Sequence, residues 1–191
     1  MQGMGAAPKS GQPSAREAAF IARVSKALHA RYPTAAEAQT AGYMRMTPVG
    51  KDGTSIFFNH RFSGMDALHP NFLWYDRRGK LMGLDYEYPV NSWRSPPGPD
   101  VYPVSPSRWT TVGEHVHFAY RTPAGTIRMR GTRVRPNLKG TIGAAQLRAD
   151  GLLPSGATFL WAYYHPKCWD LGFWLVRNPS GAFADLNPLV H

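Results

Sequence analysis

Two histidines, His115 and His117, stand one residue apart in the stretch GEHVHFAYR, which alternates polar and apolar residues as a β-strand does. Because side chains alternate along a strand, both imidazoles project from one face, and Arg121 shares that face. A neutral imidazole is a metal ligand, and an imidazole N–H is a donor to an anion. The stretch therefore predicts a ligand site, and the residues across from it decide which ligand fits.

The next strand, TIRMRGTRV, follows a turn at Thr122–Gly125, so we expect a β-hairpin. We predict a register in which His117 faces Arg130 and Ala119 faces Arg128, because it leaves the apolar residues of both strands together on the other face. A shift by one residue would bury the arginines, at a high cost.

Guanidinium groups beside imidazoles suit an anion, because both present N–H donors. The stretch from His115 to Ala149 contains seven Arg and Lys residues and no Asp or Glu. We therefore interpret this stretch first as part of a cationic pocket for a small anionic or metal-linked ligand, in a binding protein without catalytic activity. The expected lining residues are His115, His117, Arg121, Arg128 and Arg130.

A divalent metal site is the alternative, with His165 from YYHPKCW as the third ligand after His115 and His117. Further candidates for that third position are His60, Glu114 and Asp85. A positive charge about 5 Å away opposes a bound cation, so the neighbouring arginines favour the anion.

The His-x-His spacing of His115 and His117 resembles the motif of the cupin family, in which two histidines flank one residue. That motif continues with a Glu a few residues later and has a Gly well before it. Here Phe118, Ala119, Tyr120 and Arg121 follow, and Gly113 lies only two residues before the first histidine. The metal interpretation implies a cupin-like or oxygenase-type enzyme. Because the stretch departs from the cupin motif at these positions, we infer no specific cupin activity from the resemblance.

Two further groups of residues contain side chains that could take part in a reaction. Asp85 and Glu87 share one face of the predicted strand KLMGLDYEY, and paired carboxylates can perform acid–base chemistry. With so many arginines in the chain, we interpret them as balancing charges. Cys168 is the single cysteine, so it forms no disulfide within the chain, and we interpret it as a partly buried apolar side chain rather than a catalytic thiol.

The net charge of +10 and the isoelectric point near 10.0 favour anionic partners. Nucleic acid bound by the basic segment Arg121–Lys139 is therefore a third functional hypothesis. No apolar run is long enough for a transmembrane helix.

The elements that hold these residues are also predictable. Ser14 with Glu17, and Thr34 with Glu37, form capping boxes at the starts of two helices within residues 14–42. Residues 43–191 are rich in predicted strands. We expect a single α+β domain in which two N-terminal helices pack on a mostly antiparallel, strongly curved sheet or barrel of about eight strands.

The remaining segments are less regular. Residues 1–13 have the composition of a flexible leader, and they lack the apolar core of a signal peptide. We expect either a cytoplasmic protein or an extracytoplasmic one whose targeting signal has been removed. A proline-rich loop after Pro89 is expected to be held to the surface by Trp93 and Tyr102. The closing stretch, CWDLGFWLVRNPSGAFADLNPLV, resembles bacterial proteins that end in Trp-rich strands and Asn-Pro turns, a resemblance that implies no activity.

Overall fold

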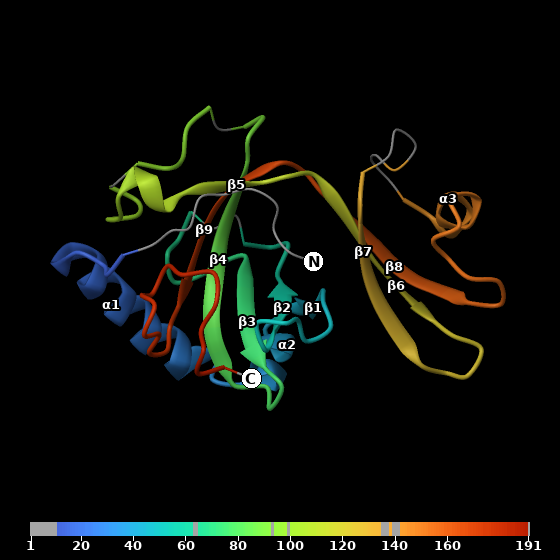
Figure 1. Ribbon diagram of the computed structural model, residues 1–191, viewed down its shortest axis with the longest axis horizontal. Helices are drawn as coiled ribbons and strands as arrows, with labels where there is room; N and C mark the ends of the chain where they lie inside the picture. Colours follow the sequence, from blue (N-terminus) through green and yellow to red (C-terminus); the bar gives the residue numbers. More distant parts are fainter. Residues whose placement is uncertain are drawn as a thin grey trace.

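The computed structural model describes residues 11–62, 65–92, 94–98, 100–134, 138 and 142–190. Within these residues the chain is an α+β protein whose strands all pair antiparallel in two sheets (Figure 1). The helices are α1 (Ala15–Arg31), α2 (Ala35–Thr40), α3 (Ala144–Ala149) and the short 3-10 helix η1 (Pro106–Arg108). The strands are β1 (Met44–Arg45), β2 (Thr54–Phe58), β3 (Phe72–Asp76), β4 (Leu81–Pro89), β5 (Thr110–Val112), β6 (His115–Arg121), β7 (Ile127–Arg133), β8 (Thr158–His165) and β9 (Cys168–Trp174).

The N-terminal helices begin where the sequence predicts. The Ser14 hydroxyl accepts a hydrogen bond from the Glu17 backbone N–H, and the Glu17 carboxylate accepts one from the Ser14 N–H at 2.8 Å. Thr34 and Glu37 repeat this capping box at α2. Both predicted helix starts are therefore confirmed. None of the helices in the described part of the chain has the length and apolar character needed to cross a bilayer.

The larger sheet has six strands in the order β1-β2-β3-β4-β9-β5. One of its faces carries Leu84, Tyr86 and Phe173, which are fully buried against α1. The Phe20 ring of α1 meets the Phe173 ring edge to face at a centroid distance of 5.8 Å. This face of the sheet and α1 together form the main hydrophobic core.

The smaller sheet has three strands in the order β7-β6-β8. Val116, Phe118 and Tyr120 of β6 pack on one face with Leu147 of α3, in a second hydrophobic cluster. The apolar face predicted for β6 is therefore confirmed. Figure 1 shows this sheet and α3 beside the larger sheet, on the side away from α1.

The prediction of one strongly curved sheet or a barrel is wrong, because the described strands form two separate sheets without closure. The chain passes between the sheets twice, and both passages are short. Only Gly113 and Glu114 separate β5 from β6, and only Pro166 and Lys167 separate β8 from β9. At each passage two residues outside the strands join a strand of one sheet to a strand of the other, as happens where a chain switches between packed sheets.

The β6–β7 hairpin forms as expected, but its predicted register is wrong by one residue. Arg121 pairs with Ile127, so that Phe118 rather than His117 lies opposite Arg130. The turn explains the shift: the Thr122 carbonyl accepts a hydrogen bond from the Gly125 N–H at 2.9 Å, and Gly125 has a φ of 83°. This is a three-residue loop with a left-handed glycine, rather than the loop that the predicted register requires.

The observed register does not bury the arginines, because β7 is the edge strand of its sheet. Arg128 and Arg130 share a face with the core residues of β6, yet both lie at that edge and are not buried. The expected cost of burial therefore does not arise.

The proline-rich loop is held as predicted at Tyr102, which is fully buried and shares a hydrogen bond with the Tyr88 hydroxyl at 2.6 Å. Tyr88 belongs to the core face of the larger sheet. The second expected anchor, Trp93, lies outside the described residues.

Candidate functional site

The three histidines expected to act together meet where the two sheets join. His115 begins β6 and lies directly opposite His165, the last residue of β8. Their rings stack at a centroid distance of 4.3 Å, with an angle of 18° between the planes. The Nε2 atoms of His115 and His117 are 2.8 Å apart. The structure thus brings together the three imidazoles named from the sequence.

The arginines named with them do not join this group. Arg128 pairs with Tyr120 and Arg130 with Phe118, so both project from the face of β6 opposite to the histidines. The expected cationic pocket that combines these two arginines with His115 and His117 is therefore contradicted by the register.

Arg121, the third arginine expected to line the pocket, and Arg133, which was not named, project from the histidine face. Arg121, at the far end of β6, is exposed and donates a hydrogen bond to the Gly125 carbonyl at 3.2 Å. Arg133, which is also exposed, lies opposite His115, while the residue opposite His117 is Gly131.

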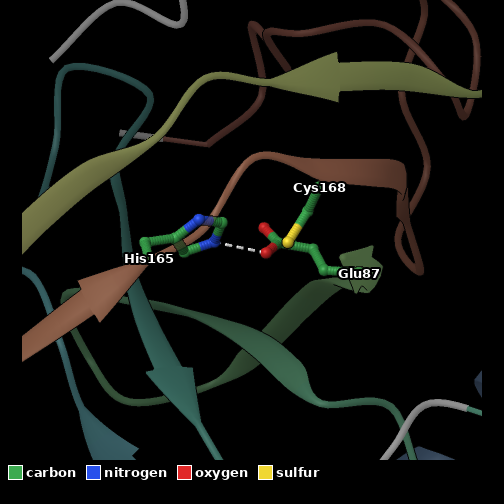
Figure 2. A group of neighbouring side chains, drawn as sticks. All are labelled: Glu87, His165 and Cys168. Atoms are coloured by element: carbon green, nitrogen blue, oxygen red, sulfur yellow. Dashed lines mark hydrogen bonds and ion pairs between the residues drawn. The ribbon is translucent and has the colours of Figure 1, made fainter. Parts of the chain in front are cut away.

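Two residues to which the sequence assigned no role in this site complete the group. Glu87 of β4 forms an ion pair with His165 through its Oε2 atom and the imidazole Nε2. Cys168, the first residue of β9, lies beside this pair (Figure 2). One ligand atom from each of the three residues lies within 4.8 Å of the other two. The site thus draws on both sheets.

Strand pairing explains why these residues converge. Glu87 lies opposite Asp170, and Pro89 lies opposite Cys168, in the β4–β9 ladder. Since directly opposed residues share a face, Glu87, Asp170 and Cys168 all project away from the α1 core. Asp85, Glu87 and Asp170 form a second group of oxygen atoms within 4.8 Å of one another. The acidic side chains therefore gather on the face that meets the histidines.

Hydrogen bonds hold the candidate ligands in place. The Nδ1 atom of His165 lies 2.7 Å from the Pro166 carbonyl, and that of His115 lies 2.8 Å from the Gly113 carbonyl. A carbonyl only accepts, so both Nδ1 atoms carry a proton. The Nε2 atom of His165 then points to Glu87, and that of His115 points to His117. Metal-binding histidines are oriented in this way by a second hydrogen bond.

A buried asparagine positions Glu87. The Asn71 side chain donates to the Glu87 carbonyl at 2.8 Å and accepts from the Glu87 N–H at 3.0 Å. Asn71 is buried, and its two bonds fix the backbone of β4 at the site.

The environment changes the acidity of the histidines and the cysteine in the group. Burial lowers the pKa of His115 to about 4 and that of His117 to about 3, and the neighbouring imidazoles add to the effect. Burial also opposes a charge on His165, but the Glu87 carboxylate outweighs it and raises the pKa of His165. Burial and the nearby carboxylates raise the pKa of the Cys168 thiol. At neutral pH, His115 and His117 are thus neutral, the form that binds metals.

A nucleophilic cysteine needs a nearby base, and the geometry does not supply one from His165. Its two ring nitrogens are engaged by Glu87 and by the Pro166 carbonyl. Cys168 is 4% exposed, which agrees with its interpretation as a buried side chain. This arrangement fits a metal ligand better than a catalytic thiol.

The remaining candidates for a third ligand lie in different surroundings. Glu114 accepts a hydrogen bond from the Tyr164 hydroxyl at 2.7 Å. His60 is exposed in the turn that follows β2. Asp85 accepts a hydrogen bond from the Trp74 indole N–H at 2.5 Å and lies in the acidic group beside Glu87.

The sequence alone does not identify Glu87 and Cys168 as members of the site. The shared face of Asp85 and Glu87 is readable from strand alternation, but their partner is not. His165 lies 78 residues from Glu87 along the chain, and only the fold brings the two together.

No protein-family model, no curated protein and no solved structure matches this chain. Its function must therefore be inferred from the geometry of the site.

Proposed function

We propose that this chain binds one divalent transition metal ion of the zinc type through Glu87, His165 and Cys168, with His115 and His117 as neighbouring imidazoles that extend the ligand set. The observation that supports this most is the convergence of a carboxylate, an imidazole and a thiol within 4.8 Å at a buried junction of two sheets.

The chemistry of the three side chains suits such an ion. Carboxylate oxygen, imidazole nitrogen and thiolate sulfur are all zinc ligands, and three protein ligands leave a fourth position for water or a substrate. Ligand atoms around a tetrahedral zinc lie about 3.3–3.7 Å apart. Atoms that are within 4.8 Å therefore need shifts of about 1 Å or less to reach that geometry.

Charge balance supports the same ion. A buried charge is costly unless it is compensated. Binding of the ion releases two protons to solvent, one from the Nε2 atom of His165 that now pairs with Glu87 and one from the Cys168 thiol. The divalent cation with the Glu87 carboxylate, the Cys168 thiolate and the resulting neutral His165 is then a group without net charge. The ion supplies the compensation that allows a buried thiol to lose its proton.

Titration of the metal-free chain with Co²⁺ and Zn²⁺ tests the proposal. We expect one equivalent of Co²⁺ to give a visible spectrum with a thiolate-to-cobalt charge-transfer band in the near ultraviolet. Cys168→Ser should remove that band, and His165→Ala should weaken binding at least about 100-fold, the effect expected for loss of a ligand. His60→Ala is the control and should bind as the unchanged chain does.

Circular dichroism of each variant separates loss of a ligand from loss of the fold. A folded chain that binds neither Co²⁺ nor Zn²⁺ stoichiometrically at neutral pH would refute the proposal. If His165→Ala bound Co²⁺ with the affinity of the unchanged chain, the ligand assignment would be refuted.

The arginines of the β6–β7 hairpin favour a second candidate function, the binding of nucleic acid. None of Arg121, Arg128, Arg130 and Arg133 is buried. Lys139, the end of the predicted basic segment, lies outside the described residues. This candidate predicts retention on heparin at low salt and an affinity for DNA or RNA that falls steeply as salt rises.

A further inference from the structure

A hollow of about 350 Å³ opens beside the candidate metal cluster. Its walls come from both sheets: Phe58 lies on β2, Phe72 on β3 and Tyr163 on β8. Glu87 and Cys168 belong both to this hollow and to the metal cluster. A molecule in the hollow would therefore lie next to a metal ion held by those residues.

The walls are aromatic. The rings of Phe58 and Phe72 lie 4.7 Å apart with 29° between their planes, and the ring of Tyr163 lies 4.9 Å from that of Phe58. Phe62 adds another ring and Met65, 42% exposed, adds an apolar side chain. Such walls bind a flat apolar molecule well, since aromatic pairs gain energy beyond their buried area.

The polar end of the hollow selects the head group of its ligand. Glu87 contributes a carboxylate, and Asp170 lies within 4.8 Å of it. The ion pair with His165 offsets one negative charge here, but the Asp85 and Asp170 carboxylates lie in the same group and leave this end of the hollow negative. That charge repels a carboxylate or phosphate on a ligand, whereas a neutral hydroxyl donates a hydrogen bond to Glu87. The same hydroxyl oxygen is a ligand for a divalent metal.

We propose that this hollow binds a small neutral aromatic molecule with a hydroxyl group, of the phenol class, whose hydroxyl lies at Glu87. The placement of that hydroxyl next to a metal rests on the proposed metal-binding function. The volume is at the lower end of the range for small-molecule pockets, which is about 300–1,000 Å³, and suits a compound of one or two rings.

Calorimetry with three compounds on the same two-ring skeleton tests the assignment: 2-naphthol, its carboxylate analogue 2-naphthoate, and the saturated decahydro-2-naphthol. Each is titrated into the folded metal-free chain and into the Co²⁺-loaded chain. Without metal, we expect 2-naphthol to bind about tenfold or more tightly than 2-naphthoate, because the carboxylates of Asp85, Glu87 and Asp170 outweigh the positive charge of their partner His165. It should bind about 2–10-fold more tightly than the saturated alcohol.

A matched pair of variants checks the location. Phe58→Leu should weaken 2-naphthol binding about 2–10-fold and leave the Co²⁺ spectrum unchanged. Phe159→Leu is the control, because Phe159 is also a partly buried ring but packs in the second hydrophobic cluster with α3. It should leave the affinity unchanged.

The outcomes separate this inference from the metal proposal. If Co²⁺ binds but 2-naphthol binds no better than the other two compounds, the phenol assignment is overturned and the metal site stands. If 2-naphthol binds in a Phe58-dependent way to a chain that takes up no Co²⁺, the hollow is supported and the metal proposal fails. If both bind, a change in the Co²⁺ spectrum on adding 2-naphthol supports the placement of the hydroxyl, and an unchanged spectrum refutes it.

Discussion

The two faces of the six-stranded sheet are built from the same strands but have opposite character. In β4, Leu84 and Tyr86 project into the core beneath α1, while Asp85 and Glu87 project from the other face. The core face needs only apolar residues of suitable size. The function of the other face depends on which distant side chain comes to lie beside each carboxylate.

The polar face is nevertheless packed. The Trp74 indole lies over Gly83 and Gly172, and a Cβ atom at either glycine would collide with neighbouring atoms. The same indole donates its hydrogen bond to Asp85. The two glycines thus allow a large ring to lie flat on the sheet and to hold one carboxylate of the acidic group. Both faces of the sheet are therefore closely packed, and they differ mainly in whether their side chains are apolar or polar. Substitutions on each face test this difference.

The largest effect is expected on the core face, from Phe173→Ala. Phe173 is fully buried and its ring meets those of Phe20 and Phe183. The loss of the ring and the resulting cavity should lower the free energy of unfolding by about 3–5 kcal/mol, measured by urea denaturation. Leu186→Ala, at a side chain that is 62% exposed, is the control and should change it by less than about 0.5 kcal/mol. A loss below about 1 kcal/mol for Phe173→Ala would contradict the assigned core.

A second effect concerns the ion pair between Glu17 of α1 and Arg108 of η1. Burial alone would raise the pKa of Glu17, but hydrogen bonds from Arg108 and from the backbone N–H groups of Ser14 and Ser105 lower it from 4.5 to about 2. A carboxylate with a lowered pKa stabilises the fold above its unfolded pKa and loses that contribution as pH falls. Unfolding free energy should therefore fall by up to about 3 kcal/mol between pH 4.5 and pH 2.

Urea denaturation at several acidic pH values measures this loss. Glu17→Gln should be less stable than the unchanged chain at neutral pH, and its stability should depend less on pH in that range. An identical pH dependence in both chains would show that Glu17 is not the responsible group.

A third effect tests the packing of the polar face. In Gly172→Ala, the new Cβ would overlap the Asp85 carboxylate and lie 3.0 Å from the Trp74 indole. Overpacking of this kind should cost about 1–3 kcal/mol in unfolding free energy. Gly113→Ala is the matched control, because its Cβ would meet no atom within 4 Å and it should change stability little. Equal stability of the two variants would mean that the polar face is loosely packed.

Much of the fold is readable from the sequence, because its rules are local. The capping boxes at Ser14 and Thr34 place both helices, and alternation in β6 identifies its core face. The partition into two sheets is not local, because it depends on the short passages between β5 and β6 and between β8 and β9. A sequence pattern does not show whether consecutive strands pair or separate.

The site is predictable from the sequence only where its residues are related by a local pattern. The spacing of His115 and His117 shows that their side chains share a face, and the position of His165 at a strand end makes it a reasonable partner. The pairing of β4 with β9, which brings Glu87 to Cys168, spans much of the chain and leaves no local pattern. The predicted hairpin register is wrong because one left-handed glycine, Gly125, changes the loop by one residue and moves Arg130 to the other face.

The smallest effect is expected from substitution of arginines in the β6–β7 hairpin. Their effects on Co²⁺ binding show which arginine lies on the same face of the hairpin as the histidines. Arg130→Ala should leave Co²⁺ affinity unchanged, because Arg130 projects from the face opposite to His117. Arg133 lies opposite His115 and is exposed, so Arg133→Ala removes a screened positive charge and should tighten Co²⁺ binding by about twofold at low salt. Calorimetry at two salt concentrations measures both, and the Arg133 effect should shrink as salt rises. A larger, salt-dependent gain in Arg130→Ala than in Arg133→Ala would instead place Arg130 beside the histidines and restore the register with His117 opposite Arg130.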